Sequence, residues 1–276
     1  MRTLQEYLER MNGSGGKGQS LKKHLSAVGI KEWADITRGS LYELRDHLAD
    51  TLAPNSQRTV MANFKSLLNR VKDDVDIPKD FDKILVAKST QPLKTYLTEE
   101  DLDKFQKVKP NTLRQEFVKN VFLICAYTGL RVSDAMHLTS DNIEGNNLHY
   151  IAQKTKKPNA IPLKPSLVER IKWISEHKEY NVSLVSYNIT VRKLCKKAGI
   201  DEEVVVFKAG KEKKGPKWKF VSSHTARISM ATCLDRRGVK IGDIKQLLQH
   251  SSVQITERYI VRDRIELSEN AMEFFA

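Results

Sequence analysis

Cysteine is scarce in this chain of 276 residues, and its distribution argues against a disulfide framework. The three cysteines are odd in number and scattered among residues typical of helices: Cys125, Cys195 and Cys233. Such spacing indicates reduced thiols that pack in a core, as in proteins of the cytosol.

Long apolar runs are also missing from the sequence. The N-terminus has no apolar segment of the kind found in signal peptides, and no apolar run is long enough to cross a bilayer. We therefore expect a soluble, cytoplasmic protein that has no membrane partner.

Acidic residues are too few to balance the basic ones. The chain has 34 Asp and Glu against 47 Lys and Arg, which gives a formal net charge of +13. Residues 91–276 hold 32 basic and 22 acidic side chains, whereas residues 1–90 hold 15 and 12. This surplus indicates a polyanionic partner, most often nucleic acid. A basic surface on an ordinary enzyme is the alternative that charge by itself leaves open.

A metal-ligand set is missing where the chemically capable residues gather. Residues 221–260 contain two histidines, an arginine and a tyrosine: His224, Arg227, His250 and Tyr259. No Cys or carboxylate completes this group at the spacing of a metal site. The group suits a phosphodiester, because Arg binds phosphate oxygens in a fork, His transfers protons and Tyr can attack phosphorus. We expect no metal ion and no other cofactor.

The hydrophobic pattern predicts a mainly α protein with two domains. Residues 1–77 predict a small helical bundle, in which Thr37 or Ser40 caps the third helix. Residues 78–95 contain two prolines and no sustained period, which is typical of an interdomain linker. Residues 96–276 predict a larger, mostly helical domain.

The larger domain is predicted to have one central helix and a small β-hairpin. Residues 114–128 are strongly apolar, which is typical of a buried helix, and Gly129 ends this pattern. The period changes at residues 147–163, where two short strands are predicted. Further helices are predicted after a cap at Thr98 and over residues 134–138, 165–177, 187–199 and 241–248.

A basic segment follows at residues 207–220. It contains a single glutamate and six lysines: Lys208, Lys211, Lys213, Lys214, Lys217 and Lys219. Gly210, Gly215 and Pro216 predict an irregular, mobile loop. The lysines of this loop are expected to contact DNA phosphates. A charged loop without any role is the alternative.

Three short motifs and a hairpin occur in a specific order along the chain. Residues 128–134 are Thr-Gly-Leu-Arg-Val-Ser-Asp, and residues 224–227 are His-Thr-Ala-Arg. Residues 248–252 are Leu-Gln-His-Ser-Ser, and Tyr259 follows nine residues after His250. Between these motifs lies a Lys-Thr pair at residues 154–155, ahead of Ile-Pro-Leu.

In motif order and approximate spacing, residues 95–262 resemble the tyrosine recombinase, or phage integrase, family. Each motif is weak alone, and the four together are specific. The N-terminal bundle is similar in outline to the family's core-site DNA-binding domain. The chain has little room ahead of this bundle for the arm-binding domain of many integrases. Gln249 departs from the family pattern, which usually has Gly before the histidine.

The resemblance implies a catalytic role for six residues. Arg131 and Arg227 are expected to stabilise the negative charge on five-coordinate phosphorus. Tyr259 is expected to attack phosphorus and form a 3′-phosphotyrosine bond. Lys154 is expected to protonate the leaving 5′-oxygen.

The remaining roles are less specific. His224 and His250 are expected to hydrogen-bond a non-bridging oxygen or to assist proton transfer at the tyrosine. Asp134 is expected to support the site, either by orienting Arg131 or by binding backbone N–H groups at a helix start. Lys156 and Lys157 compete with the hairpin lysine for the role of acid.

The implied function is site-specific DNA recombination, for integration and excision of a phage or mobile element. Resolution of chromosome dimers and inversion of a segment stay open. We expect a clamp around duplex DNA and a homotetramer on synapsed DNA, built from monomers in solution. Accessory DNA-bending proteins and a place in the nucleoid are also expected. The apolar tail, residues 265–276, packs on its own domain or on a neighbouring molecule.

Two other functions fit parts of the sequence. Residues 241–260 also match a helix-turn-helix pattern, so a non-catalytic DNA-binding regulator is one alternative. A type IB topoisomerase, which relaxes supercoils with a similar set of residues, is the other.

Overall fold

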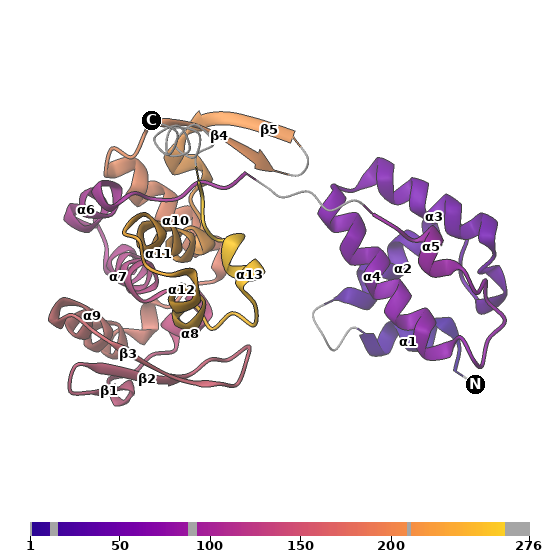
Figure 1. The fold of residues 1–276 in the computed structure, drawn as a ribbon, viewed down its shortest axis with the longest axis horizontal. Helices are drawn as coiled ribbons and strands as arrows, with labels where there is room; N and C mark the ends of the chain where they lie inside the picture. Colours follow the sequence, from indigo (N-terminus) through magenta and orange to yellow (C-terminus); the bar gives the residue numbers. More distant parts are fainter. Residues whose placement is uncertain (1, 12–15, 88–92, 209–210, 263–276) are drawn as a thin grey trace, which may run out of the picture. The chain divides into compact units, whose positions relative to one another are not determined.

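The computed structural model describes residues 2–11, 16–87, 93–208 and 211–262. The chain divides into two compact units, the first built on the first 92 residues and the second mainly on residues from Leu93 onward. Both units are mostly helical, and their strands form only small sheets (Figure 1). The predicted mainly α fold class is therefore confirmed.

The first unit is a bundle of helices around an apolar core. Its helices are α1 (Leu4–Arg10), α2 (Lys17–Ala27), α3 (Arg38–Thr51), α4 (Pro54–Val71) and α5 (Phe81–Ile84). Thr37 caps α3, and its hydroxyl accepts a hydrogen bond from the backbone N–H of Ser40 at 3.1 Å. Pro54 opens α4 in the first turn, where a helix needs no N–H donor.

The structure corrects the N-terminal boundary of the predicted linker. Residues 81–84 form α5, which packs against α3. Phe81, Ile84 and Leu85 are at most 3% exposed in the core of the first unit. One helical turn is too short to show a hydrophobic period, so the sequence did not reveal it.

The second unit is organised around one buried helix. Its helices are α6 (Glu99–Lys107), α7 (Leu113–Thr128), α8 (Val132–Met136), α9 (Pro165–Glu176), α10 (Leu184–Lys197), α11 (Ser223–Arg236), α12 (Ile241–Leu247) and α13 (Val253–Glu257). Helix α7 packs against α9, α10 and α11, and the predicted central helix is thus confirmed. A helix that is apolar on every side is stable only when neighbours cover all of it.

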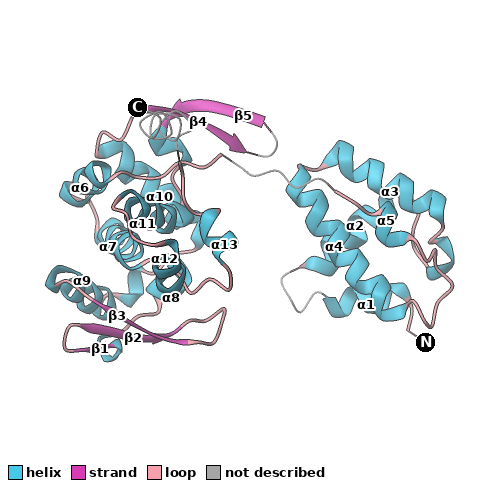
Figure 2. Cartoon of the chain, in the orientation of Figure 1, coloured by secondary structure: helices cyan, strands magenta, loops and turns pink. Residues whose placement is uncertain are grey.

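The predicted hairpin is part of a three-stranded antiparallel sheet (Figure 2). Its strands are β1 (Ile143–Glu144), β2 (Asn147–Ile151) and β3 (Pro158–Pro162). Leu148 of β2 lies opposite Ile161 of β3, and both side chains are buried. The sheet therefore attaches to the second unit by one apolar face, and the turn between β2 and β3 carries Lys154.

The predicted irregular basic loop is wrong, because this segment forms two strands. They are β4 (Glu203–Lys208) and β5 (Lys211–Pro216), and residues 217–220 add a short 3-10 helix. Both strands of a two-stranded ribbon are edges, and edge strands tolerate glycine and proline, so Gly215 and Pro216 do not exclude a strand here. Their presence in the sequence was therefore a poor signal of irregular structure.

The state of the cysteines agrees with the predicted absence of disulfides. Cys125, Cys195 and Cys233 are free thiols, of which the first two are buried. Burial raises the pKa of Cys125 to about 12.

Within the described ranges, no helix combines the length and apolar character needed to span a bilayer.

Gly129 ends α7 where no larger residue fits. Its φ is +69°, in the left-handed region. A Cβ atom at this position would lie 2.5 Å from Sδ of Met230 and 2.8 Å from Cδ2 of Leu248. The glycine therefore allows α7 to stop in direct contact with α11 and with the end of α12.

We predict that Gly129→Ala lowers stability more than Gly238→Ala. Both glycines have left-handed φ values, and a Cβ atom on Gly238 would meet nothing within 4 Å. The conformational cost is about 1–2 kcal/mol at either site, and overpacking at Gly129 adds about 1–3 kcal/mol. Chemical denaturation of the two variants measures the difference. Equal losses would show that Met230 and Leu248 move aside without cost.

Candidate active site

Arg227 connects three separate segments of the second unit. It lies in α11 and is 3% exposed. Its Nη1 donates to the carbonyl of Gly129, and its Nη2 donates to the carbonyl of Leu248. Nη2 also lies 3.1 Å from Nε2 of His250. Burial, and then the charge of Arg131, lowers the pKa of Arg227 to about 10, so it is a cation at neutral pH.

The charge of Arg227 is met by dipoles alone. Its partners are two carbonyls and an imidazole, and no carboxylate in the described part of the chain forms an ion pair with it. Its Nε is buried without a hydrogen-bond partner among the described residues. A buried cation without a counter-ion is costly, and a bound anion would remove that cost.

The contact with Arg227 fixes the tautomer of His250. A guanidinium has no acceptor, so Nε2 of His250 accepts and the ring proton is on Nδ1. Nδ1 then donates to Oγ1 of Thr256 at 3.1 Å. Burial, followed by the charges of Arg227 and Arg131, lowers the pKa of His250 to about 4. The imidazole is therefore neutral at pH 7.

Tyr259 lies two residues after the end of α13, beside this imidazole. The centroids of the Tyr259 and His250 rings are 4.7 Å apart. Cζ of Arg227 is 5.8 Å from the centroid of the Tyr259 ring. The structure thus brings together three of the predicted site residues in direct contact.

Arg131 and His224 lie at the same site. Arg131 is the residue before α8 and is partly exposed. His224 is in the first turn of α11. Its pKa is lowered by desolvation first and then by four cationic side chains: Lys94, Arg227, Arg131 and Lys154. The predicted cations therefore converge on one region of the second unit.

Asp134 forms a hydrogen bond with the hairpin turn, and no hydrogen bond between Asp134 and Arg131 occurs among the described residues. It is 5% exposed, and its Oδ1 accepts a hydrogen bond from the backbone N–H of Gln153 at 3.0 Å. Gln153 precedes Lys154, which is exposed in the turn between β2 and β3. Asp134 therefore positions the hairpin, a role that the sequence did not predict for this carboxylate.

Gln249 adopts a conformation that explains why glycine is common at its position. Its φ is +50°, in the left-handed region that a side chain disfavours. Its Oε1 accepts a hydrogen bond from Oγ1 of Thr155 at 3.4 Å. The glutamine is accommodated, and it joins the turn before His250 to the turn that carries Lys154.

The six lysines of the basic segment differ in their surroundings. Lys217 is 4% exposed, and its Nζ is 2.8 Å from Oδ2 of Asp101 and is also paired with Glu202. It therefore stabilises the packing against α6, and its predicted contact with DNA is corrected. Three of the others are exposed on β5 and one follows it: Lys211, Lys213, Lys214 and Lys219. The side chain of Lys208 lies outside the described part, as does the predicted apolar tail, residues 265–276.

Two further residues at the site were not predicted. Thr256 is fully buried and accepts from His250, and Lys94 has its Nζ 5.1 Å from the centroid of the Tyr259 ring. The spacing of six residues between His250 and Thr256 gave no signal. Lys94 lies in the predicted linker, outside the sequence motifs, so only the folded structure shows that its side chain lies at the site.

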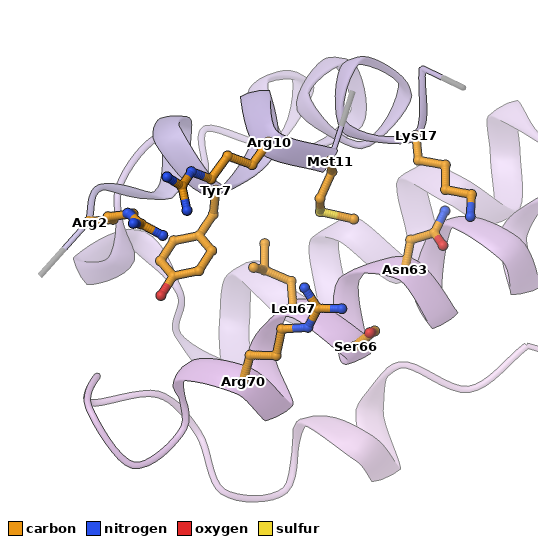
Figure 3. Close-up of a pocket in the computed structure, with 9 residues that line it drawn as sticks. All are labelled: Arg2, Tyr7, Arg10, Met11, Lys17, Asn63, Ser66, Leu67 and Arg70. Carbon is orange, nitrogen blue, oxygen red and sulfur yellow. The ribbon is translucent and has the colours of Figure 1, made fainter. Parts of the chain in front are cut away.

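The first unit has a basic pocket that the sequence did not predict. Its volume is about 340 Å³, and residues of α1, α2 and α4 line it (Figure 3). Tyr7, Met11 and Leu67 contribute apolar surface, and Asn63 and Ser66 contribute polar groups. No acidic residue lines this pocket, and its cations are Arg2, Arg10, Lys17 and Arg70.

Residues 94–264 match the sequence model of the phage integrase family. The chain belongs to the phage integrase family. The match covers every residue of the candidate active site, from Lys94 to Tyr259. No group of three or more His, Cys, Asp or Glu placed to hold a metal ion is found in the described ranges.

Two curated relatives are tyrosine recombinases. Tyrosine recombinase XerD of Lacticaseibacillus casei is 24% identical over 236 residues, which cover 80% of this chain and 77% of the relative. Tyrosine recombinase XerA of Thermococcus onnurineus (strain NA1) is 26% identical over 185 residues, or 66% and 63% of the two chains. The names of these two relatives agree with the assignment of this chain to the phage integrase family.

Solved structures share the fold at low sequence identity. XerH recombinase bound to the palindromic difH substrate has a TM-score of 0.66 at 16% identity, covering 94% of this chain and 77% of that one. A lambda integrase dimer bound to a COC′ core site has a TM-score of 0.66 at 17% identity, covering 95% and 96%. The Tn1549 transposon integrase with circular intermediate DNA has a TM-score of 0.65 at 17% identity, covering both chains fully.

The family assignment settles the class of activity. As a phage integrase family member with tyrosine recombinase relatives, the protein is a site-specific recombinase that breaks and rejoins DNA strands. The predicted family and enzyme class are confirmed. The roles of individual residues are a separate question, which their geometry addresses.

We predict that the lowered pKa of His250 makes folding stability depend on pH. The pKa is about 4 in the folded protein and 6.5 ordinarily. Between these values only the unfolded chain binds the proton, so stability is complete above pH 6.5 and falls as the pH drops toward 4. The loss is at most about 3 kcal/mol.

Urea denaturation between pH 7 and pH 4 measures this loss, with His250→Gln as the comparison. The variant lacks the titrating group, so its stability is expected to fall less over the same pH range. Parallel curves for the two proteins would contradict the lowered pKa.

Proposed function

We propose that this protein cleaves and rejoins duplex DNA at a specific site, with Tyr259 as the nucleophile. The observation that carries the proposal is the buried, uncompensated charge of Arg227 beside the phenol. Among the residues that the structure describes, Arg227 has only dipolar hydrogen-bond partners, and its Cζ is 5.8 Å from the centroid of the Tyr259 ring. A scissile phosphate supplies the anion that such a group lacks.

Two arginines stabilise the transition state in this proposal. Attack on a phosphodiester gives a five-coordinate phosphorus with extra negative charge on its oxygens. Arg227 is held rigidly by two carbonyls, so it needs no reorganisation when that charge develops. Arg131 adds a second positive charge from the start of α8. Loss of one such donor costs about 3–4 kcal/mol in the barrier.

The bonds balance without an external energy source. The phenol of Tyr259 gives its proton to the neutral imidazole of His224 or to solvent, and its oxygen forms a bond to phosphorus as the bond to the 5′-oxygen breaks. Lys154 gives its proton to that oxygen, which leaves as a free 5′-hydroxyl. The 3′-phosphotyrosine bond keeps the energy of the cleaved bond, and attack by a 5′-hydroxyl reverses the step.

The histidines assist in their neutral forms. His250 has a pKa of about 4, so at neutral pH it is uncharged, and its Nε2 lone pair accepts the hydrogen bond from Arg227. Its ring centroid is 4.7 Å from that of Tyr259. His224 lies near the same cations and contacts a non-bridging oxygen. Asp134 supports Lys154 by holding the neighbouring backbone N–H.

Duplex DNA is the proposed partner, and integration and excision of a mobile element is the proposed context. The neighbours of known structure include a lambda integrase dimer bound to a core site and a transposon integrase with circular intermediate DNA. Strand exchange between two duplexes requires four cleaving subunits, so we propose a homotetramer on synapsed DNA, with accessory DNA-bending proteins. Such an enzyme works in the cytoplasm, at the nucleoid.

The basic pocket of the first unit is proposed to bind the DNA backbone. Its four cations face no carboxylate in the pocket lining, and Asn63 and Ser66 add hydrogen-bonding groups. Exposed lysines on β5 provide further phosphate contacts. Both surfaces make binding dependent on salt, because bound phosphates release counterions.

We predict that Tyr259→Phe abolishes the covalent adduct and retains DNA binding. The substitution removes only the attacking oxygen. The assay uses a nicked duplex with the sequence that the protein selects from a random pool, and detects DNA-linked protein after denaturation. Tyr180→Phe, which changes a tyrosine outside the site, is expected to leave the adduct intact. Adduct formation by Tyr259→Phe ends the assignment.

The same assay separates this function from its rivals. A regulator binds the selected duplex tightly and never forms an adduct. A topoisomerase relaxes any supercoiled plasmid, whereas a recombinase joins strands of two duplexes that carry the selected site.

We predict that Arg70→Gln weakens binding to all duplexes by a similar factor. A lost phosphate contact lowers the slope of log affinity against log salt by about 1. Fluorescence anisotropy over a range of salt concentrations measures this slope. Arg45→Gln removes an exposed charge of the same unit outside the pocket, and its slope is expected to match that of the wild-type protein. Equal slopes for both variants would exclude the pocket from the DNA interface.

A further inference from the structure

Lys94 makes two contacts with the segment that carries Tyr259. Its Nζ donates a hydrogen bond of 2.9 Å to the backbone carbonyl of Arg258. The same ammonium lies 5.1 Å from the centroid of the Tyr259 ring. One cation therefore holds both the peptide group before the tyrosine and the ring itself.

We propose that Lys94 is a positioning residue that holds Tyr259 for attack. The inference rests on the proposed role of Tyr259 as the nucleophile. It adds a residue outside the sequence motifs, acting through the tyrosine rather than on the phosphate.

The backbone around Tyr259 needs such a contact because its own helix is short. Helix α13 has five residues, too few to be stable without tertiary contacts. Beyond it, Oγ1 of Thr232 accepts from the backbone N–H of Val261 at 3.1 Å. Lys94 binds the carbonyl of Arg258, so it fixes the segment on the other side of the tyrosine.

The surroundings of Lys94 favour a short, strong interaction. Its pKa is lowered, first by desolvation and then by the charge of Arg258. No ion pair between Lys94 and a carboxylate occurs among the residues described. Contacts of an ammonium with a carbonyl and an aromatic ring gain strength where water is partly excluded.

Substitution of Lys94 separates positioning from direct phosphate binding. Lys94→Met keeps the length of the side chain and removes the donor and the charge. Lys94→Gln keeps a donor without the charge, and Lys94→Arg keeps both. The matched control is Lys172→Met, which removes an exposed charge from α9 in the same unit.

Two readouts use the free and the DNA-bound protein. Hydrogen exchange with mass spectrometry follows the backbone amides of residues 256–261 in the free protein. Single-turnover adduct formation on the selected nicked duplex gives the cleavage rate, and anisotropy gives the affinity and its salt slope.

Lys94→Met is expected to exchange the amides of Tyr259 and Ile260 faster and to form adduct more slowly, each by roughly tenfold. Its affinity and salt slope should match those of Lys172→Met. Lys94→Arg should restore most of the rate, and Lys94→Gln should fall between the two.

Unchanged exchange and an unchanged adduct rate in Lys94→Met would overturn the inference. A salt slope lowered by about 1 with normal exchange would overturn it as well, because Lys94 would then be a phosphate contact. If the wild-type protein forms no adduct, the proposal that Tyr259 is the nucleophile is wrong. The exchange data still show in that case whether Lys94 orders the segment.

Discussion

The candidate site depends on one buried guanidinium. Arg227 binds the carbonyl of Gly129, 98 residues earlier, and the carbonyl of Leu248, 21 residues later. Burial of a charge costs several kcal/mol unless dipoles and hydrogen bonds replace water. The folded state is stable only when both carbonyls and the ring of His250 meet this side chain. Assembly of the second unit and assembly of the site are therefore the same event.

The elements around this contact are of two kinds: a rigid, buried helix, and short elements that depend on their neighbours for order. Helix α7 is buried and sets the position of Gly129, whose carbonyl reaches Arg227. The groups proposed to act on DNA lie at the margins of this rigid body. Lys154 is in a hairpin turn held by Asp134, and Tyr259 follows a five-residue helix. A short element depends on its neighbours for order, which makes the tyrosine sensitive to small displacements.

Much of the fold was predictable, and the failures have a common cause. Helix α4 was evident because its apolar residues recur at helical spacing over several turns, and α7 was evident because its long run of residues is almost entirely apolar. The single turn of α5 was missed because burial of Phe81 is decided by contacts with residues far away in the sequence. The strand β5 was missed because composition rich in lysine, glycine and proline predicts a loop, and its partner β4 was not predicted either. Each strand of a two-stranded ribbon is an edge, and edge strands tolerate that composition.

The sequence by itself determined the family, the order of the motifs and the identity of six candidate residues, because reactive groups must be of particular types. It did not determine their protonation or their partners. Tertiary structure decided that His250 is neutral, since burial and two neighbouring arginines lower its pKa to about 4. It also removed Lys217 from the lysines proposed to contact DNA and brought Lys94 to Tyr259. Charge, solvation and distance are properties of groups that meet only when the chain is folded, so spacing along the sequence does not contain them.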